Sequence, residues 1–161
     1  MRDTRRRIAG IVLINAVGIL SNDPNEIVHP DTVSPEELGR LAPYSPDLAA
    51  LSGRAETSDD ELAVMASDRI AATVYSGQPY MHDPRLRGRL HRITIPVLVL
   101  WGAHDGIVPL TYQCAYVDCL PNARLHLIAN VGHMPHIEQH ALLRQAVPHF
   151  VDGLAEQLAV D

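Results

Sequence analysis

The stretch IPVLVLWGAHDGIVP, residues Ile95–Pro109, carries the strongest fold signal in this chain of 161 residues. Its first half is an apolar run rich in β-branched residues, and Pro96 stands at the entry, where a missing N–H does least harm to a strand. Such a run is typical of a strand with both faces covered, as in a parallel sheet packed between helices. A turn-forming Gly102 and an ionisable residue, Asp105, follow just past the strand.

Two more runs extend this pattern on either side of the first. IAGIVLI (Ile8–Ile14) is nearly unbroken and apolar, whereas ARLHLI (Ala123–Ile128) alternates. Helical patterns follow the run that begins at Ile95, over residues 109–120, and the run that begins at Ala123, from His140 onward. The expected buried side of the terminal helix comprises Leu142, Leu143, Ala146, Phe150 and Leu154, and Pro148 is expected to break or kink that helix. Strands alternating with helices predict an α/β fold with a parallel sheet of about three strands.

The interval of residues 21–92 has sequence patterns typical of helices instead of strands. Ser34 with Pro35 and Glu37 predicts one capped helix start, and Ser58 with Glu61 predicts another that ends near Gly77. Apolar residues recur at helical spacing in the second helix, which predicts an amphipathic packing element with this buried face: Leu62, Met65, Ala66, Ile70 and Val74.

Composition restricts the class of protein. The net charge of −6 argues against a nucleic-acid partner, and no apolar run reaches the roughly 20 residues that would span a bilayer. The segment IAGIVLINAVGIL superficially resembles a signal peptide, but it contains Asn15 and no small-residue cleavage site follows it. Cys114 and Cys119 fit neither a metal motif nor a disulfide framework. We therefore expect a cytoplasmic protein without a membrane anchor.

Chemistry is expected at the carboxyl ends of the strands, where ligands gather in open parallel sheets. WGAHDGIVP follows one strand and NVGHMPHIEQ the next, so Asp105 and His133 should be neighbours in space. A carboxylate that holds an imidazole in one tautomer is the supporting half of a nucleophile–His–acid triad. A plain turn role remains the alternative for Asp105, because Asp before Gly favours turns.

The other polar residues near these two have simpler interpretations. His104 and His136 are expected to be structural, Trp101 to belong either to the core or to the site, and Glu138 to cap the last helix or bond to a nearby loop. A metal site is the rival hypothesis for HMPHIEQH, but Pro135 intervenes and the order is not H-E-x-x-H. No metal or organic cofactor is expected.

Taken together, these motifs resemble the C-terminal portion of the α/β-hydrolase fold family. The strand ending in WGAHD is similar to the one that delivers the family's triad acid, and the GH turn is similar to the one that delivers its histidine. The resemblance implies that Asp105 is the acid and His133 the general base. It also implies three parts: a core strand with its loop (residues 1–20), a helical cap-like insertion (21–92) and a C-terminal core (93–161).

The chain departs from the family at the nucleophile. The family places it in G-x-S-x-G or a relative of that motif, and no G-x-S-x-G occurs in the 161 residues. The oxyanion donors also precede the part that this chain resembles. The resemblance thus implies hydrolysis of an ester, C–C or related bond in a small-molecule substrate, with only Asp and His of the triad present. The alternative is a catalytically inactive hydrolase relative that acts as a binding or pairing module.

The open edge of so small a parallel sheet has a consequence for assembly. Unpaired strand edges invite association, so we expect pairing with an N-terminal hydrolase segment or a homo-oligomer formed through the edge. The isolated chain should then be oligomeric or poorly soluble. A nucleotide-binding domain is the last alternative; it requires a Gly-rich turn, whereas NAVGILSND has one glycine.

Overall fold

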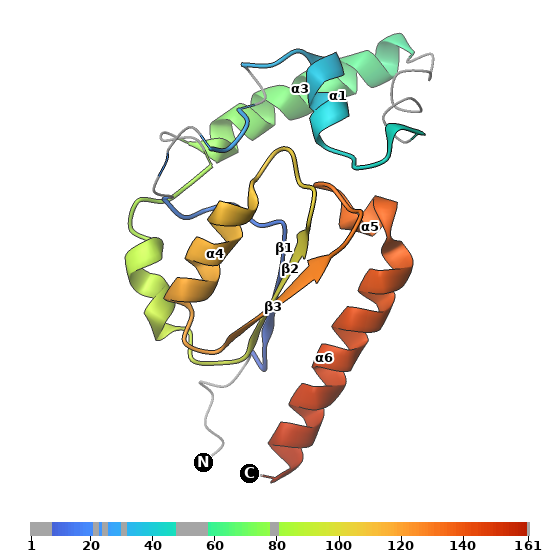
Figure 1. Ribbon diagram of the computed structural model, residues 1–161. Coiled ribbons are helices and arrows are strands. Elements are labelled where there is room, and N and C mark those ends of the chain that lie inside the picture. The colour runs from blue at the N-terminus through green and yellow to red at the C-terminus, as the bar shows by residue number, and fades with distance from the viewer. Residues whose placement is uncertain are drawn as a thin grey trace.

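A three-stranded parallel sheet forms the centre of the molecule (Figure 1). The computed structural model describes residues 8–20, 23, 26–29, 32–47, 58–77 and 81–160. The strands, in the order β1-β2-β3 across the sheet, are β1 (Ile11–Ile14), β2 (Val97–Gly102) and β3 (Ala123–Ile128). This confirms the expected α/β fold with about three parallel strands. The first strand is shorter than the apolar run from which it was predicted.

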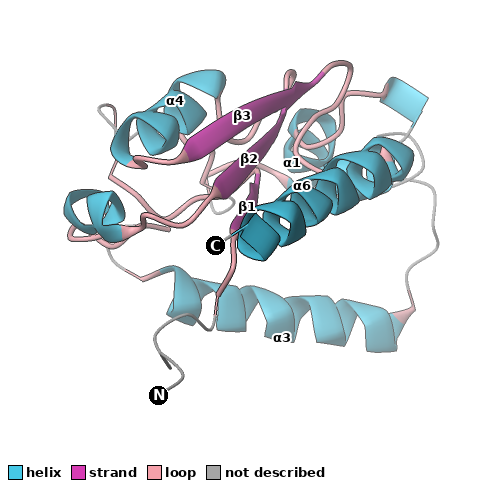
Figure 2. Ribbon diagram, turned by 90° about the horizontal axis from the view of Figure 1, so that it is seen from below, coloured by secondary structure: helices cyan, strands magenta, loops and turns pink. Residues whose placement is uncertain are grey.

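Two helices cover opposite faces of the sheet, as Figure 2 shows. They are α4 (Leu110–Cys119) and α6 (His140–Val160). Because β2 lies between its neighbours and between these helices, all six of its residues are buried. Its side chains alternate between two cores: Val97, Val99 and Trp101 face one, while Leu98 and Leu100 face the other. Each fully buried side chain of this kind contributes about 1.5–3 kcal/mol relative to an exposed one.

Helix α6 packs through fewer residues than its sequence predicts. Leu143 is buried and Phe150 packs against the same core, but Leu142 is 39% exposed, so its expected burial is wrong. Of the break or kink expected at Pro148, a break does not occur, because the helix runs on through this residue. Pro148 lies on the exposed side, where water can bond to the carbonyl that the proline leaves unpaired.

The cap-like interval contributes α1 (Pro35–Leu41), α3 (Asp59–Ser76) and the 3₁₀ helix η1 (Arg87–Arg92). Figure 1 shows α1 and α3 beyond the carboxyl ends of the strands. Both helices begin where the serines predict. The full capping box is present at Ser58, whereas at Ser34 only the serine half forms and the Glu37 carboxylate lies 3.4 Å from Arg40.

The predicted apolar face of α3 is correct in its spacing but wrong in its burial. No side chain of α3 is buried, and Leu62, Met65, Ile70 and Val74 are between 51% and 74% exposed. The capping box and Gly77, which ends the helix at φ 72°, are local signals for α3, and they are present although none of its side chains is buried by the described residues. Within the described part of the chain, no helix is long and apolar enough to cross a membrane.

Two tyrosines of α4 hold the segment that follows β1. The Tyr112 hydroxyl accepts the N–H groups of Gly18 (3.0 Å) and Ile19 (2.9 Å), and it donates to the Ile19 carbonyl (2.7 Å). The Tyr116 hydroxyl donates to the Val17 carbonyl at 2.8 Å. Burial raises the pKa of both phenols. The segment that leads into the cap-like interval is thus fixed to a core helix by buried and part-buried hydrogen bonds.

Candidate functional site

Asp105 lies in the turn after β2, with its side chain fully buried. One carboxylate oxygen accepts the backbone N–H groups of Ile107 (2.8 Å) and Val108 (2.9 Å). The other oxygen lies 2.6 Å from Asn15 Nδ2 and 2.9 Å from His133 Nδ1. Both oxygens therefore act as acceptors, and the turn that they stabilise is also the one that aims the carboxylate at the imidazole.

His133 lies in the turn after β3, just before the short helix α5 (Pro135–Glu138). Because a carboxylate only accepts hydrogen bonds, the 2.9 Å contact with Asp105 places the imidazole proton on Nδ1 and leaves the Nε2 lone pair available. The side chain is 31% exposed, so it reaches solvent on one side. The structure thus brings the two predicted site residues into direct contact.

Asn15 is a site residue that sequence reasoning missed. It follows β1 directly, is 7% exposed and adopts a left-handed backbone with φ 42°. Its side-chain N–H groups donate to Asp105 and to the Gly132 carbonyl (3.2 Å), and its oxygen accepts the Gly102 N–H (3.2 Å). One amide therefore connects the ends of all three strands. Its place immediately past a buried strand is the signal that could have identified it.

The turn after β2 that contains Asp105 (the acid turn, residues 102–108) and the turn after β3 that contains His133 (the histidine turn, residues 129–134) are in direct backbone contact. A Cβ atom on Gly102 would lie 2.0 Å from the Gly132 carbonyl oxygen, which only a glycine avoids. The His104 N–H donates to the Val131 carbonyl at 2.9 Å across the same contact. Two turns that are distant in sequence are thereby locked at one separation, and so are Asp105 and His133.

The other residues considered near the site lie as follows. Trp101 is fully buried and donates to the Val108 carbonyl at 3.2 Å, so it belongs to the core. The His104 ring lies 4.5 Å from that of Tyr44, and His136 is exposed. Glu138 bonds to the loop that contains Gly132, in agreement with one of its two expected roles. Among the described residues, no three His, Cys, Asp or Glu side chains gather as metal ligands would.

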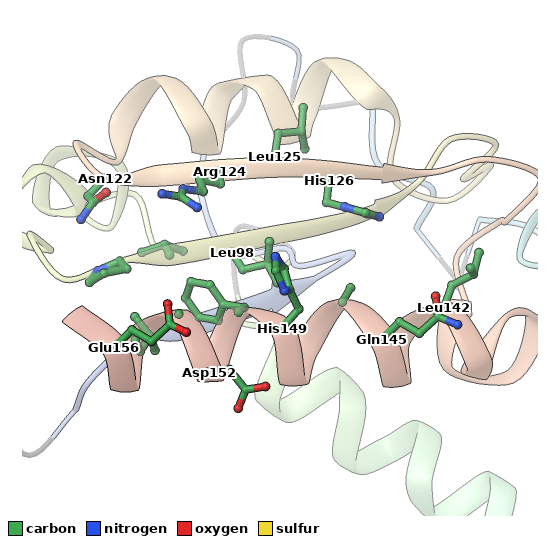
Figure 3. A pocket seen from close by; sticks show the side chains of 16 residues that line it. Leu98, Asn122, Arg124, Leu125, His126, Leu142, Gln145, His149, Asp152 and Glu156 are labelled. Atoms are coloured by element: carbon green, nitrogen blue, oxygen red, sulfur yellow. The ribbon is translucent and has the colours of Figure 1, made fainter. Parts of the chain in front are cut away.

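A large groove lies elsewhere, between α6 and the adjacent parts of β2 and β3 (Figure 3). Its volume is about 1380 Å³, and polar side chains including Arg124, His126, His149 and Glu156 lie along it. Neither the acid turn nor the histidine turn contributes to its lining. The groove is therefore separate from the Asp105–His133 pair.

A comparison with protein families matches residues 3–139 to the α/β-hydrolase fold. The chain belongs to the α/β-hydrolase family. Solved α/β-hydrolase structures agree with the fold over most of the chain. A meta-cleavage product hydrolase from Pseudomonas fluorescens IP01 superposes with a TM-score of 0.64 at 18% identity, covering 91% of this chain and 57% of that one. A bacterial membrane phospholipase A gives 0.64 at 19% identity, covering 95% and 52%.

Curated relatives in the α/β-hydrolase family match over shorter stretches. Proline iminopeptidase from Lactobacillus delbrueckii subsp. lactis is 38% identical over 61 residues, which are 38% of this chain and 20% of that protein. A 2-hydroxy-6-oxononadienedioate/2-hydroxy-6-oxononatrienedioate hydrolase from Cupriavidus pinatubonensis is 33% identical over 63 residues, or 39% and 22%. The chain spans about half the length of the solved structures and aligns with about a fifth of each of these relatives.

Proposed function

We propose that this chain carries the acid–base half of a hydrolase site, with His133 as general base and Asp105 as the residue that orients it. The observation that supports this most directly is the 2.9 Å contact between His133 Nδ1 and a fully buried Asp105 carboxylate. With its proton on Nδ1, the imidazole can take a proton through Nε2 from a nucleophile or from the hydrolytic water. Asp105 would then stabilise the imidazolium that forms.

The nucleophile, in this proposal, comes from a polypeptide segment outside these 161 residues. The segment would add to the open edge of β1, which among the described residues is paired only with β2. It would also bring the oxyanion donors, since those belong with the nucleophile turn in this family. The alternative is a homo-oligomer formed through the same edge. Sedimentation of the chain alone distinguishes this oligomer from a monomer.

The relatives suggest which bonds to test. Their names point to hydrolysis of an amide next to an N-terminal proline and of a C–C bond in a 2-hydroxy-6-oxo dienoate. In this proposal the substrate is a small molecule that contains one of these bonds, and the cap-like interval (residues 21–92) selects it. The proposed reaction needs no metal or organic cofactor, because the proton transfers use His133 and the charge stabilisation uses backbone N–H groups.

The test is hydrolysis by the chain co-expressed with the coding sequence directly upstream of its Met1 codon. Proline p-nitroanilide, p-nitrophenyl esters and a 2-hydroxy-6-oxo dienoate serve as substrates. We expect His133→Ala to lower kcat by at least about 10⁴-fold and Asp105→Asn by about 10⁴-fold, through the wrong tautomer. His126→Ala is the matched control, because His126 is exposed on β3 and contacts neither Asp105 nor His133 in the hydrogen bonds described above.

A second candidate function is a catalytically inactive pairing module. It is favoured by one observation, the lack of G-x-S-x-G in the sequence. This alternative predicts no hydrolysis of any of these substrates and no effect of His133→Ala. Activity that depends on His133 would eliminate it.

A further inference from the structure

The Glu138 carboxylate accepts hydrogen bonds from backbone N–H groups on both sides of His133. Gly132, which precedes the histidine, donates to the two carboxylate oxygens at 3.0 and 3.1 Å. Met134, which follows it, donates to Oε1 at 3.2 Å. Glu138 is the last residue of α5, and its side chain turns back toward the beginning of that helix. The backbone N–H groups of the two residues that flank His133 are thus bonded to one side chain.

The same carboxylate reaches the cap-like interval. The Tyr44 N–H donates to Glu138 Oε2 at 2.7 Å, and Tyr44 follows α1 by a few residues. The N–H of His133 itself donates to the Ala42 carbonyl at 2.6 Å. The backbone around His133 is therefore linked to residues 42–44 in two ways. One link is the direct bond to Ala42, and the other runs through the Glu138 carboxylate.

Gly132 makes this three-way contact possible. A Cβ atom at this position would lie 2.2 Å from the Ala42 oxygen and 2.7 Å from the Tyr44 nitrogen. Because Gly132 has no side chain, the backbone of the histidine turn lies in contact with the backbone of residues 42–44. Glu138 can therefore accept hydrogen bonds from both segments. At this contact Ala42 is buried in the core (5% exposed), whereas Tyr44 is 44% exposed.

We propose that Glu138 is a positioning residue that couples residues 42–44 of the cap-like interval to the orientation of the His133 imidazole. It touches no reacting atom and acts through the peptide units around the histidine. The inference rests on the proposed function in that it gives His133 its role as base. Asp105 fixes the imidazole from its Nδ1 side, and Glu138 fixes the backbone from which the imidazole projects. A displacement of residues 42–44 would consequently move His133.

The test is Glu138→Gln, which keeps the shape of the side chain. Oε1 holds the Met134 bond and Oε2 the Tyr44 bond, so an amide NH₂ in either place removes one acceptor. We expect amide hydrogen exchange of Met134 or Tyr44 to accelerate by about tenfold or more. We also expect the ¹⁵N signals of the His133 imidazole to move away from the Nδ1-protonated tautomer. In the active assembly, kcat should fall by roughly 10- to 100-fold with a smaller change in KM.

Glu61→Gln is the matched control. The Glu61 carboxylate accepts the Ser58 N–H at 2.9 Å and the Ser58 hydroxyl at 2.8 Å, so it makes bonds of the same kind in α3. This variant should leave the His133 signals unchanged. If Glu138→Gln does not fold, Glu138→Asp replaces it; its shorter carboxylate should lose the Tyr44 bond and shift the same signals.

A folded Glu138 variant with wild-type imidazole signals would overturn the proposal, whatever its stability. The imidazole signals do not depend on hydrolysis. Normal activity of His133→Ala would therefore refute the proposed function while leaving the structural coupling intact, and the two failures can be told apart.

Discussion

The turns at the strand ends and the helix α3 are held in place in opposite ways. At the strand ends, hydrogen bonds connect residues up to 117 positions apart, as between Asn15 and Gly132. Helix α3 is formed by bonds within its own sequence, including the capping box of Ser58 and Glu61, and none of its side chains is buried. The first region is specified by long-range contacts and the second by local ones.

The difference shows what an apolar pattern encodes. A helical stripe of apolar residues reports that a face is suited to burial, but the partner can lie outside the residues that form the helix. The strand-end turns carry little periodicity, yet backbone contacts and buried polar bonds fix them closely. Substitutions that disturb one region and spare the other can test this contrast.

The largest effect is expected from Gly132→Ala. Its Cβ would lie within 2.7 Å of two backbone atoms of residues 42–44, and backbone cannot move aside as a flexible side chain can. We expect a loss of about 2–4 kcal/mol in the free energy of unfolding, measured by urea titration.

Gly39→Ala is the matched glycine substitution at a position without close neighbours. Gly39 lies within α1, and an added Cβ would meet nothing within 4 Å. Here we expect a gain of up to about 0.5–1 kcal/mol, since alanine is the better helix former. Equal effects of the two substitutions would show that the strand-end turns are less tightly packed than the contacts indicate.

An intermediate effect is expected from Tyr112→Phe. The substitution removes one hydroxyl and leaves the Gly18 and Ile19 N–H groups without their acceptor in a buried place. We expect a loss of about 1–3 kcal/mol at neutral pH, again by urea titration. A change of less than about 0.5 kcal/mol would mean that water replaces the hydroxyl.

The same tyrosine predicts a pH dependence. Burial raises the pKa of Tyr112 above its ordinary value of 10.0, because the phenolate is disfavoured in the core. The contribution to stability is complete below pH about 10 and is lost as the pH rises from there through the folded-state pKa, because the unfolded chain releases its proton first. Tyr112→Phe should flatten this alkaline decline in part, with Tyr116 accounting for a remainder of the same sign.

The smallest effect is expected from Ile70→Lys in α3. Ile70 is 69% exposed, so the charge meets water and the free energy of unfolding should change by no more than about 0.5 kcal/mol. By contrast, Leu143→Ala in α6, where the side chain is 8% exposed, should cost about 2–4 kcal/mol. A loss above about 1 kcal/mol in Ile70→Lys would show that α3 packs against the chain in solution.

The sequence predicted β2, β3 and α4 well because each has a strong local pattern between clear breaks. It also predicted the Asp105–His133 contact, since residues just past adjacent parallel strands meet at one edge of the sheet. In the sequence Asn15 argues only against a signal peptide, because its bond to Asp105 spans 90 residues. No local rule reveals such a bond.

The errors have a common physical origin as well. Leu142 and the apolar face of α3 have helical spacing, but spacing does not say whether a neighbour covers the face. Pro148 predicts a break or a kink in α6, yet the helix continues through it at an exposed position, where water can bond to the carbonyl that the proline leaves unpaired. Burial and solvent access at these positions depend on tertiary packing, which periodicity alone does not contain.

The two ends of the cap-like interval meet at one point of the core. Gly18 and His82 form an isolated parallel bridge, and the Asp83 N–H donates to the Gly18 carbonyl at 3.0 Å. The segment that leaves β1 and the segment that returns toward β2 therefore lie side by side at this point. The entropic cost of closing a loop rises by only about 0.6 kcal/mol for each doubling of its length. The residues between Gly18 and His82 can therefore be replaced by a segment of another length without a change in the sheet. Any such replacement must still provide a segment that meets the histidine turn where residues 42–44 do now.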